Sequence, residues 1–244
     1  SCYLTDDQTA EMVKLIENSL GDVELAFAHE IANMAQSKGI NPYELIALAN
    51  KHPRVNILKP SCGVGGHCIA IDPWFLVESF SQQAQLIKMA RQVNDARPHR
   101  VLHTIETAIK HWKKDHEGIC KVMVCGITYK PNVNDLRESP ALFIAQSLSQ
   151  KEDISLFVHD PYVDSHMMQS LFKQSCGMEK MSQADLVIFL VGHDRYKLID
   201  HNQLRNTLVI DACGILQKWA QDANAVFRPA EPIMDFFIVN QPTE

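Results

Sequence analysis

The chain has 244 residues, of which 46% are hydrophobic, and a formal net charge of −6 at pH 7. At roughly 100 to 200 residues per domain, this length predicts one large or two modest domains, and we expect two. The acidic balance excludes a broad nucleic-acid surface, because displacing counterions from phosphates requires a basic field, whereas a small anionic ligand needs only a few local cations.

No apolar run approaches the roughly 20 residues that span a bilayer, and the start, SCYLTDDQTAEMVKL, lacks the basic flank and apolar stretch of a signal peptide. We therefore expect a cytoplasmic protein with no membrane segment. The seven cysteines are scattered and never spaced as Cys-x-x-Cys, which indicates neither a disulfide framework nor a structural zinc site. His99 and His103 stand four residues apart without further ligands, so we expect an exposed helix face there and no metal.

The first part of the chain has helical periodicity. Apolar residues recur at three- and four-residue steps from Thr9 to about Lys38, which predicts a long amphipathic helix with Thr9 as its N-cap and Gly39 as its stop. A shorter helix over 42–52 leads into a glycine-rich loop. Residues 79–114 then predict one very long helix, interrupted or kinked near Pro98.

The pattern changes near residue 117. Short β-branched apolar runs at 120–130, 154–163, 184–193 and 207–215 alternate with segments of helical length, such as 139–150. Buried strands that alternate with helices form a parallel sheet. We expect an α/β protein with an all-helical domain at 1–117 and a Rossmann-like parallel α/β domain at 118–244, whose ligand binds at the carboxyl ends of the strands.

The glycine-rich loop is the first candidate site. In KPSCGVGGHCIAIDPWFLV, three glycines precede His67 and Cys68, and Asp72 follows four residues after the cysteine. Such dense glycines indicate a sharp turn or a close approach of the backbone to another group. A core thiol would explain Cys68 alone but neither the glycines nor the polar flank, so the pattern favours chemistry at this cysteine.

Two other groups are weaker candidates. Lys14 and Asn18 stand four residues apart on the first helix, where periodicity alone favours a solvated face. Lys130, Asp135 and Arg137 lie in TYKPNVNDLRESP, a strand end and loop before a helix, where cations and helix-start amides can form an anion site. A solvated turn is the alternative for this loop.

Four stretches, in this order, carry a family resemblance: TAEMVKLIENS, ANKHPRVNI, GVGGHCIAIDPWFLV and GITYKPNVNDLRESPA. Together they resemble the nucleotide-sugar 6-dehydrogenase family (UDP-glucose/GDP-mannose dehydrogenases), and most of all its UDP-N-acetyl-D-mannosamine dehydrogenase branch. Enzymes of this family combine an NAD-binding Rossmann domain, a central helical dimerisation domain and a C-terminal Rossmann-like domain that grips the nucleotide. This chain is similar to the last two.

The resemblance implies that the chain is a fragment that is inactive by itself, because no strand-G-x-G-x-x-G-helix unit for NAD stands near its start. It also implies oxidation of the C6 alcohol of a UDP-sugar, in polysaccharide biosynthesis, with two NAD+ and through a thiohemiacetal and a thioester. Cys68 then matches the nucleophile and Asp72 the acid/base group, while Lys14 and Asn18 match the pair that stabilises the oxyanion.

For binding, the resemblance places Lys130 at the nucleotide end of the substrate, with Arg137 in the same anion site. Arg54 resembles an arginine offered across a homodimer of the helical domain, and Gly63 and Gly65 would let the backbone approach the sugar. One departure is visible: where the family commonly has Pro-Gly before G-x-G-G, this chain has Pro60, Ser61 and Cys62.

Three alternatives stay open on the sequence. The substrate of the parent enzyme is UDP-N-acetylglucosamine, UDP-glucose or GDP-mannose instead; or the chain is a nucleotide-binding fragment without catalysis of its own; or it is a purely structural helical dimer. The TYKPNVNDLRES loop argues against the last of these.

Overall fold

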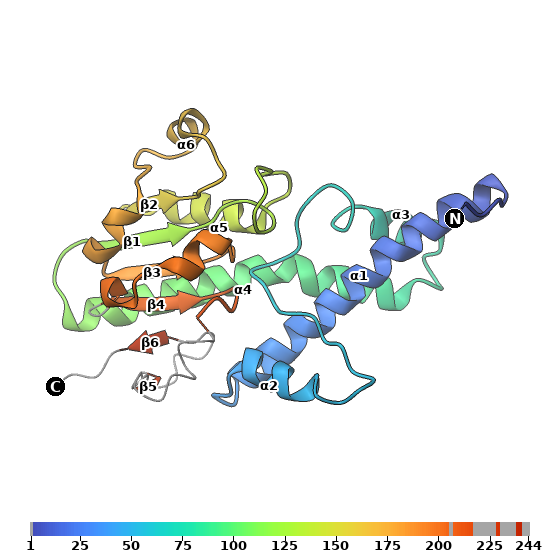
Figure 1. Cartoon of the computed structure of the whole chain (residues 1–244), viewed down its shortest axis with the longest axis horizontal. Coiled ribbons are helices and arrows are strands. Elements are labelled where there is room, and N and C mark those ends of the chain that lie inside the picture. Colours follow the sequence, from blue (N-terminus) through green and yellow to red (C-terminus); the bar gives the residue numbers. More distant parts are fainter. Residues whose placement is uncertain (1, 205–206, 217–227, 230–237, 241–244) are drawn as a thin grey trace.

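The computed structural model describes residues 2–204, 207–216, 228–229 and 238–240. It consists of a helical half and an α/β half that share one long helix, α4 (Figure 1). The elements in chain order are α1 (Asp7–Gln36), α2 (Pro42–Ala49), α3 (Asp72–Ser79), α4 (Gln85–Asp115), β1 (Cys120–Cys125), α5 (Pro140–Ser149), β2 (Ile154–His159), α6 (Ser165–Leu171), η1 (Met178–Gln183), β3 (Leu186–Phe189), η2 (Asp194–Leu198), η3 (His201–Leu204), β4 (Leu208–Asp211), β5 (Arg228–Pro229) and β6 (Ile238–Asn240).

The first predicted helix is confirmed as α1, but its N-cap is Asp6 rather than Thr9. The Asp6 carboxylate accepts hydrogen bonds from the backbone N–H of Thr9 at 2.9 Å and from its hydroxyl at 2.8 Å. Thr9 is thus the residue whose amide is capped, and the acid at Asp6 also complements the positive end of the helix. Gly39 adopts a φ of 66° just beyond the helix, which confirms it as the stop.

The prediction of one helix over 79–114 is wrong at its start. α3 ends at Ser79, and α4 begins only at Gln85. The side-chain amide of Gln85 donates to the carbonyl oxygens of Ser81 and Gln82, and such local bonds compete with helix formation. The predicted interruption near Pro98 is wrong as well, because Pro98 lies inside α4, which is one continuous helix from Gln85 to Asp115.

The α/β half confirms the four predicted strands and their parallel arrangement. The strand order is β2-β1-β3-β4-β6-β5, with β2, β1, β3 and β4 parallel and β6 antiparallel to β4. Register places Cys125 beside His159 and Phe189, and Phe189 beside Asp211, so the carboxyl ends of the four strands share one edge of the sheet. A ligand site at this edge receives loops from all four strands.

The helix α4 belongs to the cores of both halves. Its first part packs against α1 and α3, and its second part packs against α5 and β1. Val101, Ile105 and Ala108 are fully buried in the same cluster as the side chains of β1 and α5. Burying a valine or isoleucine side chain stabilises a fold by roughly 1.5–3 kcal/mol, and an alanine by less. Because α4 is buried in both halves, it fixes how the helical half meets the sheet. The division of the chain at residue 117 stays a prediction.

Candidate active site

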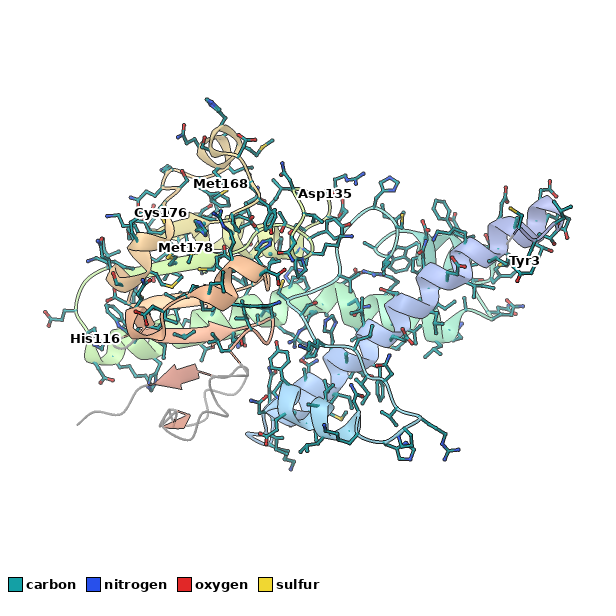
Figure 2. All side chains as sticks on the ribbon, in the orientation of Figure 1. Tyr3, His116, Asp135, Met168, Cys176 and Met178 are labelled. Carbon is teal, nitrogen blue, oxygen red and sulfur yellow. The ribbon has the colours of Figure 1, made fainter. Side chains whose placement is uncertain are left out.

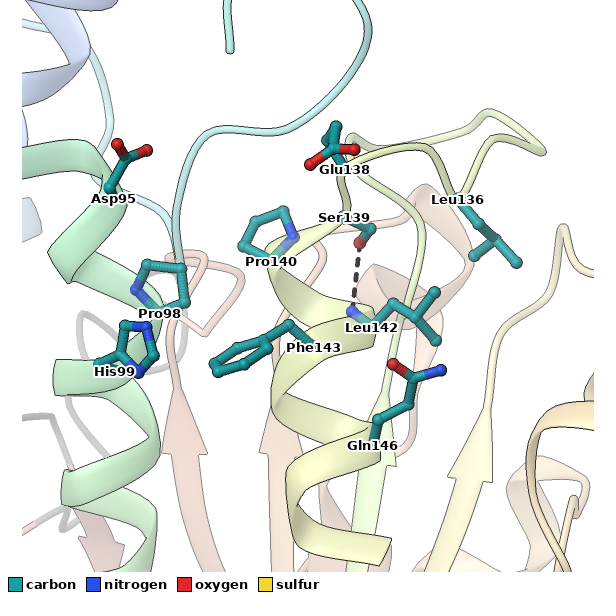
Figure 3. Close-up of a pocket in the computed structure, with 10 residues that line it drawn as sticks. All are labelled: Asp95, Pro98, His99, Leu136, Glu138, Ser139, Pro140, Leu142, Phe143 and Gln146. Atoms are coloured by element: carbon teal, nitrogen blue, oxygen red, sulfur yellow. Dashed lines mark hydrogen bonds between the residues drawn. The ribbon is translucent and has the colours of Figure 1, made fainter. Parts of the chain in front are cut away.

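The glycine-rich loop runs along the junction of the two halves. A Cβ at Gly63, whose φ is 152°, would lie 2.7 Å from Cβ of Pro140 and 2.8 Å from Cγ of Pro98. A Cβ at Gly65 would lie 2.3 Å from the backbone oxygen of Glu138. Pro98 on α4 and Pro140 on α5 face each other in Figure 3. The glycines are therefore required because α4, α5 and the loop before α5 press directly on this backbone.

Cys68, Asp72 and Asn18 form the centre of the candidate site. The carbonyl oxygen of Cys68 accepts the backbone N–H of Ile71 at 3.0 Å and that of Asp72 at 2.8 Å, which closes a turn into α3. The side-chain N–H of Asn18, on α1, donates to Oδ2 of Asp72 at 2.5 Å. The structure thus brings Asn18 to Asp72, one turn from an exposed Cys68 thiol.

Lys14 and Arg54 are not drawn into these contacts. Lys14 lies one turn before Asn18 on α1 and forms an exposed ion pair with Glu17 at 3.4 Å, which contributes little to stability. Arg54 lies in the exposed loop after α2, where its backbone N–H donates to Nδ1 of His52 at 3.3 Å. Their predicted roles stay predictions.

The loop between β1 and α5 carries the predicted anion site (Figure 2, near Asp135). Lys130 is exposed, with its ammonium 5.3 Å from the centre of the Tyr129 ring. Arg137 is instead paired with Asp135 through Nε at 3.0 Å and Nη2 at 2.6 Å. These bonds lower the pKa of Asp135 to about 2. Arg137 also reaches the glycine-rich loop, because its carbonyl oxygen accepts the N–H of Gly66 at 3.0 Å.

A buried cluster at the strand ends supports this loop. Nδ1 of His193 accepts the backbone N–H of Asn132 at 2.9 Å, so its proton is on Nε2, 3.1 Å from Oδ2 of Asp160. The same oxygen accepts the backbone N–H of Ile127 at 2.7 Å. Burial alone would raise the pKa of Asp160, but these hydrogen bonds outweigh it and leave the pKa below 3.8. These hydrogen bonds therefore hold Ile127 and Asn132, on either side of Lys130, to Asp160 and His193.

A cavity of about 330 Å³ lies between the start of the glycine-rich loop and the strand ends. Its lining combines loop residues, strand-end residues and three lysines, and comprises Lys59, Pro60, Ser61, Cys62, Gly63, Tyr129, Lys130, Pro131, Leu190, Val191, Gly192, Lys197, Cys213, Gly214 and Ile215. The sequence prediction found Lys130 and Gly63 but missed Lys59, Lys197 and Cys213. Applying the strand-end rule to the fourth strand would have found Cys213, and Lys59 opens the quoted glycine-rich stretch.

The cysteines around this site differ in their chemistry. Burial raises the pKa of Cys62 to about 12 and that of Cys213 well above its ordinary value, so both cavity thiols stay protonated at neutral pH. Cys68 is exposed. Of these three thiols, Cys68 is therefore the one that a ligand in solvent can reach.

Comparison with known proteins gives the family of the chain. Residues 8–96 match the central domain of the UDP-glucose/GDP-mannose dehydrogenase family, and residues 123–218 match its UDP binding domain. The chain belongs to the UDP-glucose/GDP-mannose dehydrogenase family. The predicted resemblance and fold class are thereby confirmed.

Relatives within this dehydrogenase family include the NDP-N-acetyl-D-galactosaminuronic acid dehydrogenase of Ralstonia nicotianae, 42% identical over 88% of this chain and 50% of that protein. The UDP-N-acetyl-D-mannosamine dehydrogenase of Methanocaldococcus jannaschii is 43% identical over 92% of this chain and 52% of that protein. The solved structure of the UDP-D-ManNAc dehydrogenase of Pyrococcus horikoshii has a TM-score of 0.74 at 32% identity, covering 87% of this chain and 50% of that one. The chain thus spans about half the length of the relatives it matches.

Within the part of the chain that the structure describes, no helix is both long and apolar enough to cross a bilayer. In the same residues, no group of three or more His, Cys, Asp or Glu is placed to hold a metal ion.

Proposed function

We propose that this chain forms the thiol centre and the nucleotide pocket of an NAD-dependent UDP-sugar 6-dehydrogenase, with UDP-N-acetyl-D-mannosamine as its substrate. The observation that carries the proposal is the lysine-lined cavity beside the loop that ends in Cys68. Two of the relatives described above bear UDP-N-acetyl-D-mannosamine (or UDP-D-ManNAc) dehydrogenase as their names. A cytoplasmic role in polysaccharide biosynthesis goes with this proposal.

The cavity suits a nucleoside diphosphate in size and charge. Its volume of about 330 Å³ falls within the roughly 300–1,000 Å³ of small-ligand pockets. Lys59, Lys130 and Lys197 line it from three different segments, and lysine ammoniums form charge-assisted hydrogen bonds to phosphate oxygens. Gly63 is also in this lining, and we propose that it and Gly65, two residues on, let the backbone approach the sugar.

The residues near Cys68 have the groups that the covalent chemistry needs. Addition of the Cys68 thiolate to a C6 aldehyde forms a C–S bond and places negative charge on the aldehyde oxygen. Asn18 has two amide hydrogens, so one can bind Asp72 while the other stabilises that oxygen, together with Lys14. Loss of a hydride from C6 of this adduct, for which NAD+ would be the acceptor, would give the thioester. In its hydrolysis, Asp72 orients the water that attacks the thioester carbonyl, and the Cys68 thiolate leaves.

At the two helices that follow β1 and β2, the described residues do not fit an NAD+ site. Such a site presents free amides at a helix N-terminus to the pyrophosphate. Here the Ser139 hydroxyl accepts the N–H of Leu142 at the start of α5 (Figure 3), and a carboxylate, Asp164, caps α6. We therefore propose that NAD+ is held by a part of the parent protein other than this chain, which by itself binds nucleotide without oxidising the sugar.

We also propose that the chain is a homodimer through its helical half. Five large apolar side chains on α1 are about half exposed, from 48% to 58%: Val13, Ile16, Leu20, Phe27 and Met34. Their spacing of three, four and seven residues places them along one side of the helix. A second copy would bury this stripe, and Arg54 would then be offered to the site of the partner.

Calorimetry of the chain with UDP tests the proposal. Lys130→Ala should weaken binding by roughly 1–3 kcal/mol, because a charge-assisted contact is lost. Lys121→Ala is the matched control, since Lys121 is an exposed lysine at the opposite end of β1. Equal affinity of both variants, or absence of UDP binding by the unaltered chain, would contradict the nucleotide pocket. Tighter binding of GDP than of UDP would favour a GDP-mannose enzyme.

Two activity measurements complete the test. The chain incubated with NAD+ and a UDP-hexosamine should form no NADH, and measurable formation would show that the cofactor binds here. In the parent enzyme, Cys68→Ser should abolish acid production and leave substrate binding nearly unchanged, because a serine ester forms and hydrolyses far less readily.

A further inference from the structure

The glycine-rich loop is fastened at Ser61, seven residues before Cys68, by buried side chains of two helices. The backbone N–H of Ser61 donates to Nε2 of His29, on α1, at 3.2 Å. Its carbonyl oxygen accepts Nε–H of Arg97, on α4, at 3.0 Å. The Ser61 hydroxyl donates to the carbonyl oxygen of Gly63 at 2.7 Å and closes a local turn. Both backbone groups of this residue are thus satisfied by side chains rather than by a helix or a strand.

His29 has a defined orientation within this clamp of His29, Arg97 and Ser61. An amide N–H can only donate, so Nε2 of His29 is the unprotonated nitrogen and Nδ1 carries the hydrogen. Nδ1–H then donates to Oδ1 of Asn94 at 2.8 Å, and the Asn94 amide donates to Oδ1 of Asp22 at 2.8 Å. Burial, and next the charge of Arg97, lower the pKa of His29 to about 3, which keeps the ring neutral and able to accept.

The side chains that form this clamp are buried and closely packed. His29 is fully buried, and Asn94 and Arg97 are each 1% exposed. Arg97 also donates to Oδ1 of Asn33 at 2.6 Å, which holds its guanidinium against α1. Between Ser61 and Cys68, Gly63 is pressed by Pro98 and Pro140. Displacement of Ser61 must therefore move the segment that leads to the thiol, because close-packed neighbours transmit shifts.

The geometry points to His29 and Arg97 as positioning residues: they set the place of the loop that forms one wall of the nucleotide cavity and carries Cys68. Neither residue lines the cavity, so both act through the backbone of Ser61, which does. This inference rests on the proposed function for the identity of the ligand and of the reactive thiol. The hydrogen bonds themselves do not depend on it.

A pair of His29 variants separates positioning from simple packing. His29→Leu keeps an apolar volume and removes the acceptor for Ser61, whereas His29→Gln keeps an acceptor oxygen near the position of Nε2. Thr104→Val is the stability control, because Thr104 is equally buried on α4 and its hydroxyl donates only within that helix, to the carbonyl oxygen of Arg100.

Two readouts on the chain report on the loop. We expect His29→Leu to lower UDP affinity about fivefold or more, and His29→Gln to restore most of it, because a buried unpaired N–H moves toward water. The second readout is the rate of alkylation of Cys68 by iodoacetamide divided by that of the exposed Cys2 in the same molecule. Relative to the unaltered chain, this ratio should change about threefold or more in His29→Leu and should not change in Thr104→Val.

Each outcome decides the inference. The inference fails if all three variants lower stability but have the same UDP affinity and alkylation ratio as one another. His29 would then have only a structural role. If the unaltered chain does not bind UDP, the proposed function fails, and the alkylation ratio alone then decides the inference. Should His29→Leu not fold, Arg97→Lys, which keeps the charge but loses the Nε–H bound to the carbonyl oxygen of Ser61, must change that ratio; an unchanged ratio overturns the inference.

Discussion

Replacing Gly65 by alanine tests the contact between the glycine-rich loop and the α/β half. The added Cβ would lie 2.3 Å from the carbonyl oxygen of Glu138, 2.8 Å from Cδ of Pro140 and 3.0 Å from Cβ of Tyr129. The nearest of these atoms belongs to the backbone, so no side-chain rotation relieves the clash. Glu138 is itself a non-glycine residue with a φ of 47°, a conformation that leaves it little freedom to move.

The size of the effect follows from these distances. Ordinary contact begins at 3.4 Å, so Gly65 and Glu138 must separate by about 1 Å. Forcing one extra carbon into a packed site costs roughly 1–3 kcal/mol, which is a large share of the stability of a domain. Since a chain of this size loses about 2–4 °C per kcal/mol, the melting temperature of Gly65→Ala should fall by several degrees.

Thermal and urea unfolding, followed by circular dichroism, measure this loss. The matched control is Gly39→Ala, because Gly39 has a φ of 66° but no atom within 4 Å of the added Cβ. The control should lose only the roughly 1 kcal/mol of a left-handed alanine and keep its UDP affinity, whereas Gly65→Ala should lose both stability and affinity. If Gly65→Ala were as stable as the unaltered chain, the loop could not pack against Glu138 and Pro140 as described.

Three other changes have definite expected signs. Gly21→Ala should stabilise the chain by about 0.5–1 kcal/mol in urea unfolding, because Gly21 lies within α1 and its Cβ would meet only Cδ1 of Ile69 at 3.9 Å; a loss of stability would mean that α1 and Ile69 lie closer. The pKa of Asp160 is lowered below 3.8 in the fold, so its contribution is present above the ordinary pKa and is lost as pH falls through the folded value. Unfolding from pH 6 to pH 2.5 should therefore show a steeper acid loss for the unaltered chain than for Asp160→Asn, and parallel curves would refute this. Leu20→Asp on the exposed α1 stripe should give a monomer in sedimentation, while Leu198→Asp, at 84% exposure in the α/β half, should leave the oligomeric state unchanged; the same state for both would refute the α1 interface.

The architecture was predictable because each half has its own periodicity. Three- and four-residue spacing marked α1, and buried β-branched runs marked the four parallel strands. Apart from the interruption predicted near Pro98, the errors lie at element ends, where local side-chain hydrogen bonds determine at which residue a helix begins. Asp6 rather than Thr9 is the cap because its carboxylate accepts the Thr9 amide, and the Gln85 side-chain amide donates to a carbonyl oxygen of the segment between α3 and α4. Neither competition alters the apolar pattern, so periodicity alone does not detect it.

The part of the candidate site that is local in sequence was predictable. Cys68 and Asp72 are close in sequence, and the turn between them follows from their spacing. Asn18 lies 54 residues from Asp72 and was named only through the family resemblance. Lys197, in η2, and Cys213, after β4, join the cavity and were not predicted. Such partners depend on how α1 and the sheet pack around α4, which one-dimensional periodicity does not encode.

The glycine-rich loop and the loop between β1 and α5 contact each other, and this contact joins the segment before Cys68 to the loop that carries Lys130. The N–H of Gly66, two residues before Cys68, donates to the carbonyl oxygen of Arg137, and Arg137 lies on the same loop as Lys130. His193 holds the base of that loop through Asn132. Under the proposed function, a nucleotide bound at Lys130 would stabilise the folded form of this loop, since any ligand stabilises the state to which it binds. The hydrogen bond from Gly66 to Arg137 is the contact through which that stabilisation would reach the Cys68 loop.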